Sequence, residues 1–314
     1  MTGGEPFEAV VRRVDARGCE VVPASGGDPV FARVRGRLHR FSRAERTPLA
    51  PGDRVLVAES DGGASVRSVL PRRSRFLRES SSGARPQVLA ANLDLVAAVL
   101  PCAEPEPSPR LADRILVAAA SEGVEGAVLL TKADLAPPEV VADLEALYAR
   151  AGVRAIAVSV PGERGLSRAA DLLRGRTSVL VGPSGAGKTT LLRRLLGPAG
   201  DDLRVGPVNP KTGKGRHTTT AARLLPFPGG GWTVDTAGVR TLALGGLRPA
   251  DVALHFPDLA GVGPCRFADC SHTVEPGCAL EAAAGAGRVD PRRLESCRAI
   301  IRQIAEDESR RRGW

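Results

Sequence analysis

The strongest chemical signal in the sequence is a phosphate-binding loop at residues 182–189. Its letters, GPSGAGKT, fit the pattern G-x-x-x-x-G-K-[ST]. In this pattern backbone N–H groups surround a polyphosphate, the lysine reaches the outer phosphates, and the final hydroxyl can bind Mg²⁺. A plain glycine-rich turn is the alternative. The loop, however, lies between an apolar strand expected at 177–181 and a helix expected at 188–196, which is the setting that the motif requires.

We therefore expect this loop to hold the phosphates of a nucleotide. Lys188 is the expected catalytic cation, and Thr189 is an expected Mg²⁺ ligand. The full set of expected phosphate-site residues is Gly182, Pro183, Ser184, Gly185, Ala186, Gly187, Lys188, Thr189 and Thr190.

A second motif, Thr131-Lys132-Ala133-Asp134, follows an apolar strand expected at 126–130. Open α/β sheets bind ligands at the carboxyl ends of their strands. An aspartate there can accept hydrogen bonds from both the N1–H and the exocyclic amine of guanine, while the lysine stem covers the base. Adenine lacks this pair of donors, so Asp134 predicts a preference for guanine.

A third motif, Asp235-Thr236-Ala237-Gly238, follows a strand expected at 232–234. The aspartate can hold Mg²⁺ through water, and the N–H of Gly238 can contact the γ-phosphate. A turn at the end of a strand is the alternative. The polar loop 207–220 precedes it, and one of the threonines at 218–220 can complete the Mg²⁺ shell when a triphosphate orders the loop. The sequence leaves the choice open, and Thr219 is our candidate.

A fourth cluster has the spacing of a metal site. It consists of Cys265, Cys270, His272 and Cys278. Three thiolates and one imidazole suit a closed, tetrahedral and therefore structural zinc site. Scattered core cysteines are the alternative, but Pro264 and Gly277 provide the turns that a wrapped ligand set needs.

The elements that must position these residues fall into three regions. Residues 1–72 form short strands separated by glycine and proline, which predicts a small OB-type β-barrel. Residues 73–245 alternate strands and helices, which predicts an α/β P-loop domain with a parallel sheet. Residues 246–314 are expected to form a mostly helical zinc-binding domain that ends in a helix over 292–311.

Basic side chains suggest an anionic partner. The formal net charge is +9, and a basic surface favours nucleic acid. In the barrel region Arg33, Arg35 and Arg37 alternate with smaller residues, so a strand would place them on one face. An ordinary solvated face is an equal alternative. The sequence contains no run of eighteen apolar residues, so we expect no membrane segment and a cytoplasmic protein.

The order of the motifs is unusual. The base-recognition residues precede the phosphate loop, whereas ordinary GTPases have the reverse order. Read from Thr131–Asp134 through Val158-Ser159, the phosphate loop, 217–220 and 235–238, the chain resembles the circularly permuted ribosome small-subunit-dependent GTPase A (RsgA) family. The resemblance covers essentially the whole chain, metal motif included, and adds Ser159 to the guanine site.

The resemblance implies a multidomain GTPase with an OB barrel, a circularly permuted GTPase domain and a zinc domain. It implies binding to the small (30S) ribosomal subunit and its rRNA, activation by that subunit, and a role in its late assembly. The expected ligands are GTP or GDP, Mg²⁺ and one structural Zn²⁺, and we expect a monomer.

This sequence departs from the family pattern at three positions. Thr131 replaces the usual asparagine, Ala237 replaces the usual proline, and Val239 stands where many GTPases have the glutamine that positions water. The resemblance suggests His217 as the substitute catalytic residue, and a solvated or RNA-contacting histidine is the alternative. Two rival functions remain: an RNA-binding scaffold that uses GTP only as a switch, and a P-loop ATPase or kinase.

Overall fold

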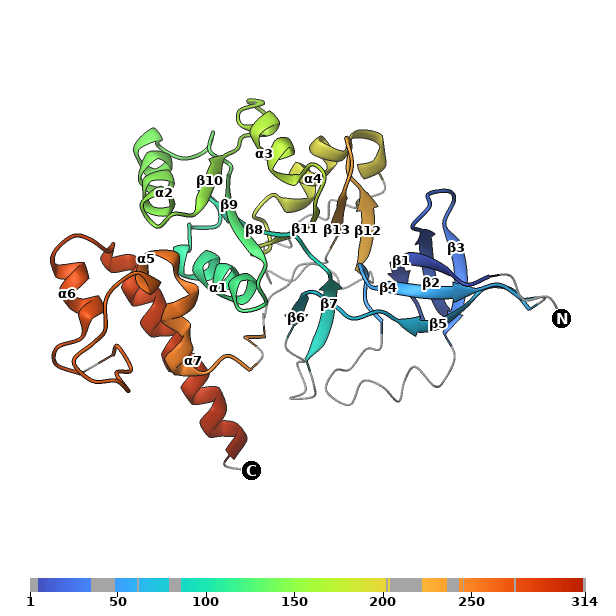
Figure 1. Cartoon of the computed structure of the whole chain (residues 1–314). Coiled ribbons are helices and arrows are strands. Elements are labelled where there is room, and N and C mark those ends of the chain that lie inside the picture. Colours follow the sequence, from blue (N-terminus) through green and yellow to red (C-terminus); the bar gives the residue numbers. More distant parts are fainter. Residues whose placement is uncertain are drawn as a thin grey trace. The chain divides into compact units, whose positions relative to one another are not determined.

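The computed structural model describes residues 5–34, 49–60, 62–78, 86–201, 203, 222–235, 243–244, 246–273 and 275–312 (Figure 1). The chain divides into two compact units. The first contains residues 1–95, 170–184 and 188–243, and the second contains 96–169, 185–187 and 244–314.

The first unit begins with the expected β-barrel. Its strands are β1 (Phe7–Val14), β2 (Gly18–Pro23), β3 (Val30–Val34), β4 (Arg54–Ala58) and β5 (Ser65–Val69). They pair in the order β1-β2-β3-β5-β4, and a β1–β4 pairing closes the barrel. Alternate residues point inward, and the buried set includes Val11, Val21, Val55 and Val57. On β3, Ala32 is buried while Arg33 is exposed, whereas Arg35 and Arg37 lie outside the described residues.

The first unit also carries the strands around the phosphate loop. These are β11 (Thr177–Val181), β12 (Arg223–Pro226) and β13 (Trp232–Asp235), and the helix after the loop is α4 (Lys188–Leu196), followed by the short η2 (Gly197–Gly200). β11 pairs with β13 in parallel, and β12 pairs with β13 in antiparallel fashion. β12 also pairs with β1, so this sheet continues into the barrel.

A two-stranded sheet, formed by the segment that follows the barrel strands along the chain, was not expected from the sequence. It consists of β6 (Arg75–Arg78) and β7 (Gln87–Ala91), which are antiparallel. Leu77 and Val88 of this hairpin pack with Ala50 and Ala243 in a small cluster. The backbone N–H of Ala243 donates to the carbonyl of Leu77. The hairpin therefore anchors the chain shortly after the 235–238 motif.

The second unit contains the strands before the phosphate loop. They are β8 (Leu95–Pro101), β9 (Glu125–Thr131) and β10 (Arg154–Ala157), in the order β10-β9-β8, with β9 and β10 parallel. The helices between and after them are α1 (Pro109–Ala120), α2 (Pro138–Arg150) and α3 (Leu166–Leu173). Proline opens α1 and α2, as expected at a first helical position. Every residue of β8 is buried, which is typical of a strand covered on both faces.

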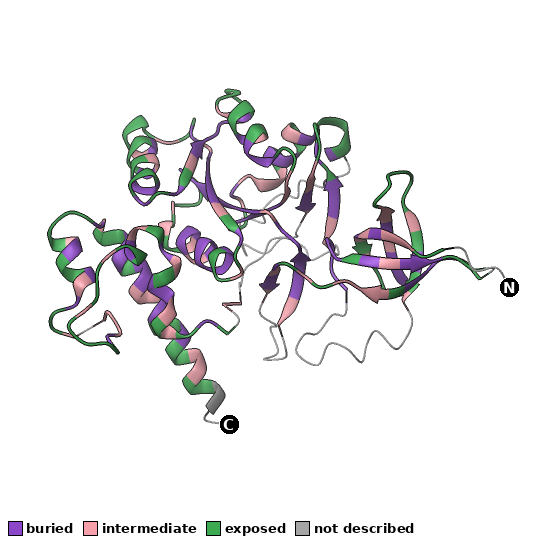
Figure 2. Ribbon diagram, viewed as in Figure 1, coloured by how far each residue is buried: buried purple, intermediate pink, exposed green. Residues whose placement is uncertain are grey.

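The C-terminal helices belong to the same unit. They are η3 (Pro249–His255), α5 (Pro257–Ala260), α6 (Ala279–Gly285) and α7 (Pro291–Arg312). The buried positions of α7 lie between Arg293 and Ile304, and the helix residues that follow up to Arg310 are exposed or half-buried (Figure 2). Leu294, Ile300 and Ile304 of α7 share one core with Val117 of α1. The helix expected over 292–311 is therefore observed, and its apolar side chains face this core.

One buried cation ties α7 to the earlier helices. Arg293, whose side chain is 2% exposed, pairs with Asp258 of α5 and with Asp113 of α1. Its guanidinium lies 4.6 Å from the ring centre of Phe256. Burial raises the pKa of Asp113, while the charge of Arg293 opposes that shift.

The described part of the chain contains no helix long and apolar enough to span a bilayer.

Candidate nucleotide and metal sites

The phosphate loop connects β11 to α4, as the motif requires. Gly185 and Gly187 have φ angles of 80° and 81°, a conformation that favours glycine. The ammonium of Lys188 folds back on the loop and donates to the carbonyls of Gly182 and Pro183, at 2.8 Å and 2.7 Å. Desolvation lowers the pKa of Lys188 to about 8. A bound phosphate would supply the opposite charge that this buried ammonium needs.

The base motif is joined to the phosphate loop by a side chain. Thr131 is buried, and its hydroxyl donates to the carbonyl oxygen of Ala186 at 2.7 Å. The threonine that replaces the family's asparagine therefore makes a polar bond to the loop. Lys132, at φ 55°, donates from its ammonium to the carbonyl of Glu104. Sequence reasoning missed this contact, because nothing in the proline-rich stretch before α1 marks Glu104.

The structure also brings Ser159 beside the base motif. The N–H of Ala133 donates to the carbonyl of Val158 at 3.2 Å. The Ser159 hydroxyl is buried and accepts a hydrogen bond from the N–H of Gly162 at 3.0 Å. Asp134 is exposed, so its carboxylate is accessible to a ligand.

The 235–238 motif is described only at its first residue. Asp235 ends β13 and lies directly opposite Arg223 of β12. Burial raises the pKa of Asp235, and the charge of Arg223 acts to lower it. Thr189 is half-buried and Thr190 is exposed at the start of α4. His217, Thr219 and Gly238 lie outside the described residues, as do Arg216, Thr218, Thr220, Ala237 and Val239.

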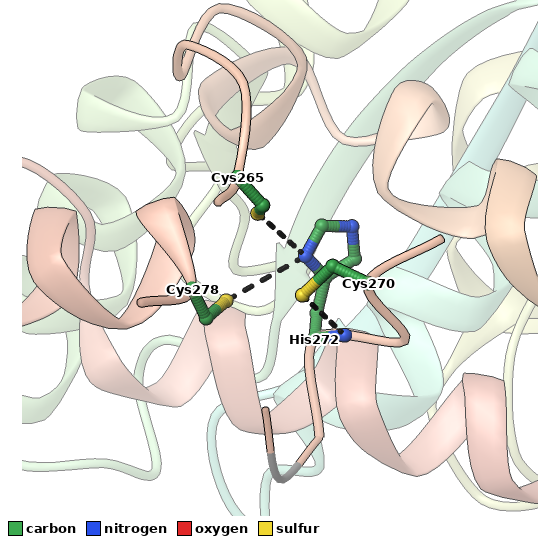
Figure 3. A group of neighbouring side chains, drawn as sticks. All are labelled: Cys265, Cys270, His272 and Cys278. Atoms are coloured by element: carbon green, nitrogen blue, oxygen red, sulfur yellow. Dashed lines mark hydrogen bonds between the residues drawn. The ribbon is translucent and has the colours of Figure 1, made fainter. Parts of the chain in front are cut away.

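The four expected metal-binding residues gather in one place (Figure 3). Their ligand atoms all lie within 4.8 Å of one another. The Nδ1 of His272 is 3.5 Å from the Sγ of Cys265 and 3.6 Å from the Sγ of Cys278. Four ligands at bond lengths of about 2.0–2.3 Å around one ion would have similar mutual separations.

The surroundings of the cluster favour the ligand forms of His272 and Cys265, whereas burial raises the pKa of Cys270 to about 12. Burial lowers the pKa of His272, which keeps the imidazole neutral. Burial alone would raise the pKa of Cys265, but hydrogen bonds, led by the N–H of Ala279 at 3.2 Å, bring it below its usual value. Arg298 of α7 donates to the His272 carbonyl at 2.7 Å and so fixes the loop to the core. This Cys/His cluster can hold a metal ion.

A match to a protein-family model identifies the family of the chain. The model described as "RsgA GTPase" matches residues 69–245. The chain belongs to the RsgA GTPase family. Membership of the RsgA family confirms the prediction that the protein is a GTP-hydrolysing enzyme.

Individual relatives match over most of their length. The small ribosomal subunit biogenesis GTPase RsgA of Azotobacter vinelandii is 44% identical, with 85% of this chain and 78% of that protein covered. The protein of the same name from Gemmatimonas aurantiaca is 41% identical, with 86% and 89% covered.

Solved structures support the RsgA fold over nearly the whole chain. YjeQ from Thermotoga maritima superposes with a TM-score of 0.76 at 25% identity and covers 96% of this chain and 99% of that one. YloQ, described as a circularly permuted GTPase, gives a TM-score of 0.71 at 21% identity, with 96% of each chain covered. The expected fold, a barrel followed by a permuted GTPase domain and a helical C-terminal region with a Cys/His cluster, is confirmed.

Proposed function

We propose that this protein hydrolyses GTP during assembly of the small ribosomal subunit, that it binds the subunit's rRNA, and that the subunit activates it. The observation that carries the proposal is the Thr131–Ala186 hydrogen bond, which joins the guanine motif to the phosphate loop. The names of the relatives, small ribosomal subunit biogenesis GTPases, support the assembly role. The basic net charge of +9 supports an RNA partner.

In the proposed site each residue has a distinct task. Asp134 accepts hydrogen bonds from guanine, with Thr131, Lys132, Ala133 and Ser159 forming the rest of the base site. Residues 182–187 surround the phosphates with backbone N–H groups, and Lys188 neutralises charge that develops during hydrolysis. Gly238 contacts the γ-phosphate, and His217 orients the attacking water. Turnover is slow without the ribosomal partner, because the chain lacks a glutamine after Gly238.

Two metal ions complete the proposal. Mg²⁺, when bound, would neutralise the charge of the outer phosphates, and Thr189, Thr219 and Asp235 would hold it. Zn²⁺ would be held by Cys265, Cys270, His272 and Cys278, with a purely structural role.

The domain organisation is part of the same proposal. We place an OB-fold RNA-binding domain at 1–72, a circularly permuted GTPase domain at 73–245 and a zinc-binding domain at 246–314. The protein would act as a monomer in the cytoplasm.

The deciding experiment is GTP turnover by the purified protein at fixed salt, with and without purified small ribosomal subunits. We expect strong stimulation that Lys188→Ala abolishes. GTP binding without stimulation would favour a scaffold that uses GTP only as a switch. A parallel assay of Asp134→Asn tests the base. An asparagine amide can donate to the C2 carbonyl of xanthine, so preference should move from GTP toward XTP. ATP preference that survives this substitution would instead indicate an ATPase or kinase.

A further inference from the structure

A row of charged side chains runs across three strands of the first unit. Asp235 of β13 lies opposite Arg223 of β12, and Arg223 lies opposite Arg13 of β1. Directly opposed residues on antiparallel strands project from the same face, with Cβ atoms about 5 Å apart. Arg223 therefore has a carboxylate on one side and a second guanidinium on the other.

Both neighbours act on Arg223 in the same direction. The carboxylate of Asp235 attracts the guanidinium, and the like charge of Arg13 repels it. Arg13 is exposed, whereas Arg223 and Asp235 are half-buried, so solvent screens the attraction less than the repulsion. The Nε of Arg223 is buried and has no hydrogen-bond partner within the described part of the chain. Within the described residues, the Nε–H of Arg223 therefore forms no hydrogen bond that would draw the guanidinium toward another carboxylate.

The row also joins two functional regions. Asp235 belongs to the motif proposed to contact Mg²⁺ and the γ-phosphate, while Arg13 belongs to the barrel. Arg12, the neighbour of Arg13, donates to the carbonyl of Leu224 at 3.4 Å, which adds a side-chain bond to the β1–β12 pairing. The barrel thus supports the strand that carries Arg223.

We propose that Arg223 is a positioning residue for GTP hydrolysis, which restrains the carboxylate of Asp235, and that Arg13 directs Arg223 toward it. This inference rests on the proposed GTPase function. Asp235 acts at the outer end of the triphosphate, whereas the base and the inner phosphates supply most of the binding contacts. Loss of Arg223 should therefore lower kcat and leave KM and GDP affinity almost unchanged.

The first test compares Arg223→Gln with Arg223→Lys in GTP turnover without ribosomal subunits. We expect Arg223→Gln to lower kcat by about tenfold with KM within about twofold, as for a misplaced catalytic group. Arg223→Lys should keep most of the activity, because it retains the charge. Unchanged kcat in Arg223→Gln would overturn the inference. So would equal losses of activity and thermal stability in both variants, since these indicate a merely structural role.

The second test uses a residue outside the nucleotide site. Arg13→Glu offers Arg223 a competing carboxylate, so kcat should fall severalfold. The same change should have no further effect in an Arg223→Gln background. Arg67→Glu, an exposed charge reversal on β5 of the same barrel, should leave basal turnover unchanged. Equal effects of Arg13→Glu in both backgrounds would overturn the coupling.

These outcomes are distinct from failure of the proposed function. If the unmodified protein does not hydrolyse GTP, or if Lys188→Ala does not slow it, the proposed function fails. If both behave as expected while Arg223→Gln retains full turnover, only the inference about Arg223 fails.

Discussion

The hydroxyl of Thr131 donates to the carbonyl of Ala186, 55 residues further along the chain. The motif proposed to recognise the base is thereby bonded directly to the phosphate loop. We expect Thr131→Val, which keeps the shape but removes the donor, to weaken GDP binding by about 1–2 kcal/mol, or about tenfold, because the Ala186 carbonyl loses its partner. Titration with a fluorescent GDP analogue measures this.

The matched control is Thr131→Asn, whose amide can also donate to the carbonyl. It should bind GDP at least as well as the unmodified protein. Equal weakening in the valine and asparagine variants would indicate that packing, and not the hydrogen bond, determines the affinity.

The low pKa of Lys188 predicts a pH dependence of nucleotide binding. Without nucleotide, desolvation lowers this pKa from 10.5 to about 8. A bound phosphate stabilises the charged form and raises the pKa again, so binding above pH 8 requires proton uptake. GDP affinity should therefore be constant below about pH 8 and weaken above it, by up to about tenfold per pH unit.

Calorimetry from pH 6.5 to 9, below the ionisation of guanine itself, measures this dependence. Lys188→Met should bind more weakly at every pH and lose the decline. A flat profile in the unmodified protein would contradict the lowered pKa. For folding the sign is opposite: the unfolded chain binds the proton more strongly, so this lysine destabilises the nucleotide-free protein below pH 8. That penalty disappears as the pH rises to about 10.5.

The Cys/His cluster predicts one tightly bound zinc ion per chain. Cys270→Ser should lose the metal and lower the unfolding temperature. Cys297→Ala, which changes a buried cysteine of the same core outside the cluster, should keep it. Because the thiolates and imidazole must be deprotonated, zinc affinity should fall as the pH falls. Elemental analysis and thermal unfolding test both statements, and equal zinc content in the two variants would contradict the assignment.

Two adjacent arginines on α7 should differ sharply in their effect on stability. Arg293 is buried with Asp113 and Asp258, so Arg293→Met should lower the free energy of unfolding by about 3–5 kcal/mol, since it leaves buried carboxylates unpaired. Arg292 pairs with Asp143 and Asp290 at the surface, and Arg292→Met should cost at most about 1 kcal/mol. Urea unfolding compares them, and similar losses would show that burial does not set the cost.

The sequence predicts the elements that have strong local signals. β11 and α4 begin and end at the residues expected for them. The apolar run of β11 and the glycine-bounded loop before α4 can be recognised within a few residues. The Cys/His cluster and the motif order can also be recognised, because each depends on spacing along the chain.

Other elements lack such strong local signals. The two strands of the β6–β7 hairpin are short and, among the described strands, pair only with each other, whereas β12 also pairs with β1, far away in the sequence. The contact of Lys132 with Glu104 depends on the course of the loop before α1, which no local pattern predicts. The position of Arg223 opposite Asp235 depends on register, which is a property of the folded sheet.

The pairing of β12 with β1 has a practical consequence for dissecting the protein. β12 has β13 on one side and the barrel on the other. Removing residues 1–72 to isolate the catalytic part would leave its outer backbone groups unpaired, and such strand edges promote association between molecules. A shortened protein is therefore prone to aggregate even if its nucleotide site folds. Loss of activity after truncation would measure solubility as much as it measures the contribution of the barrel.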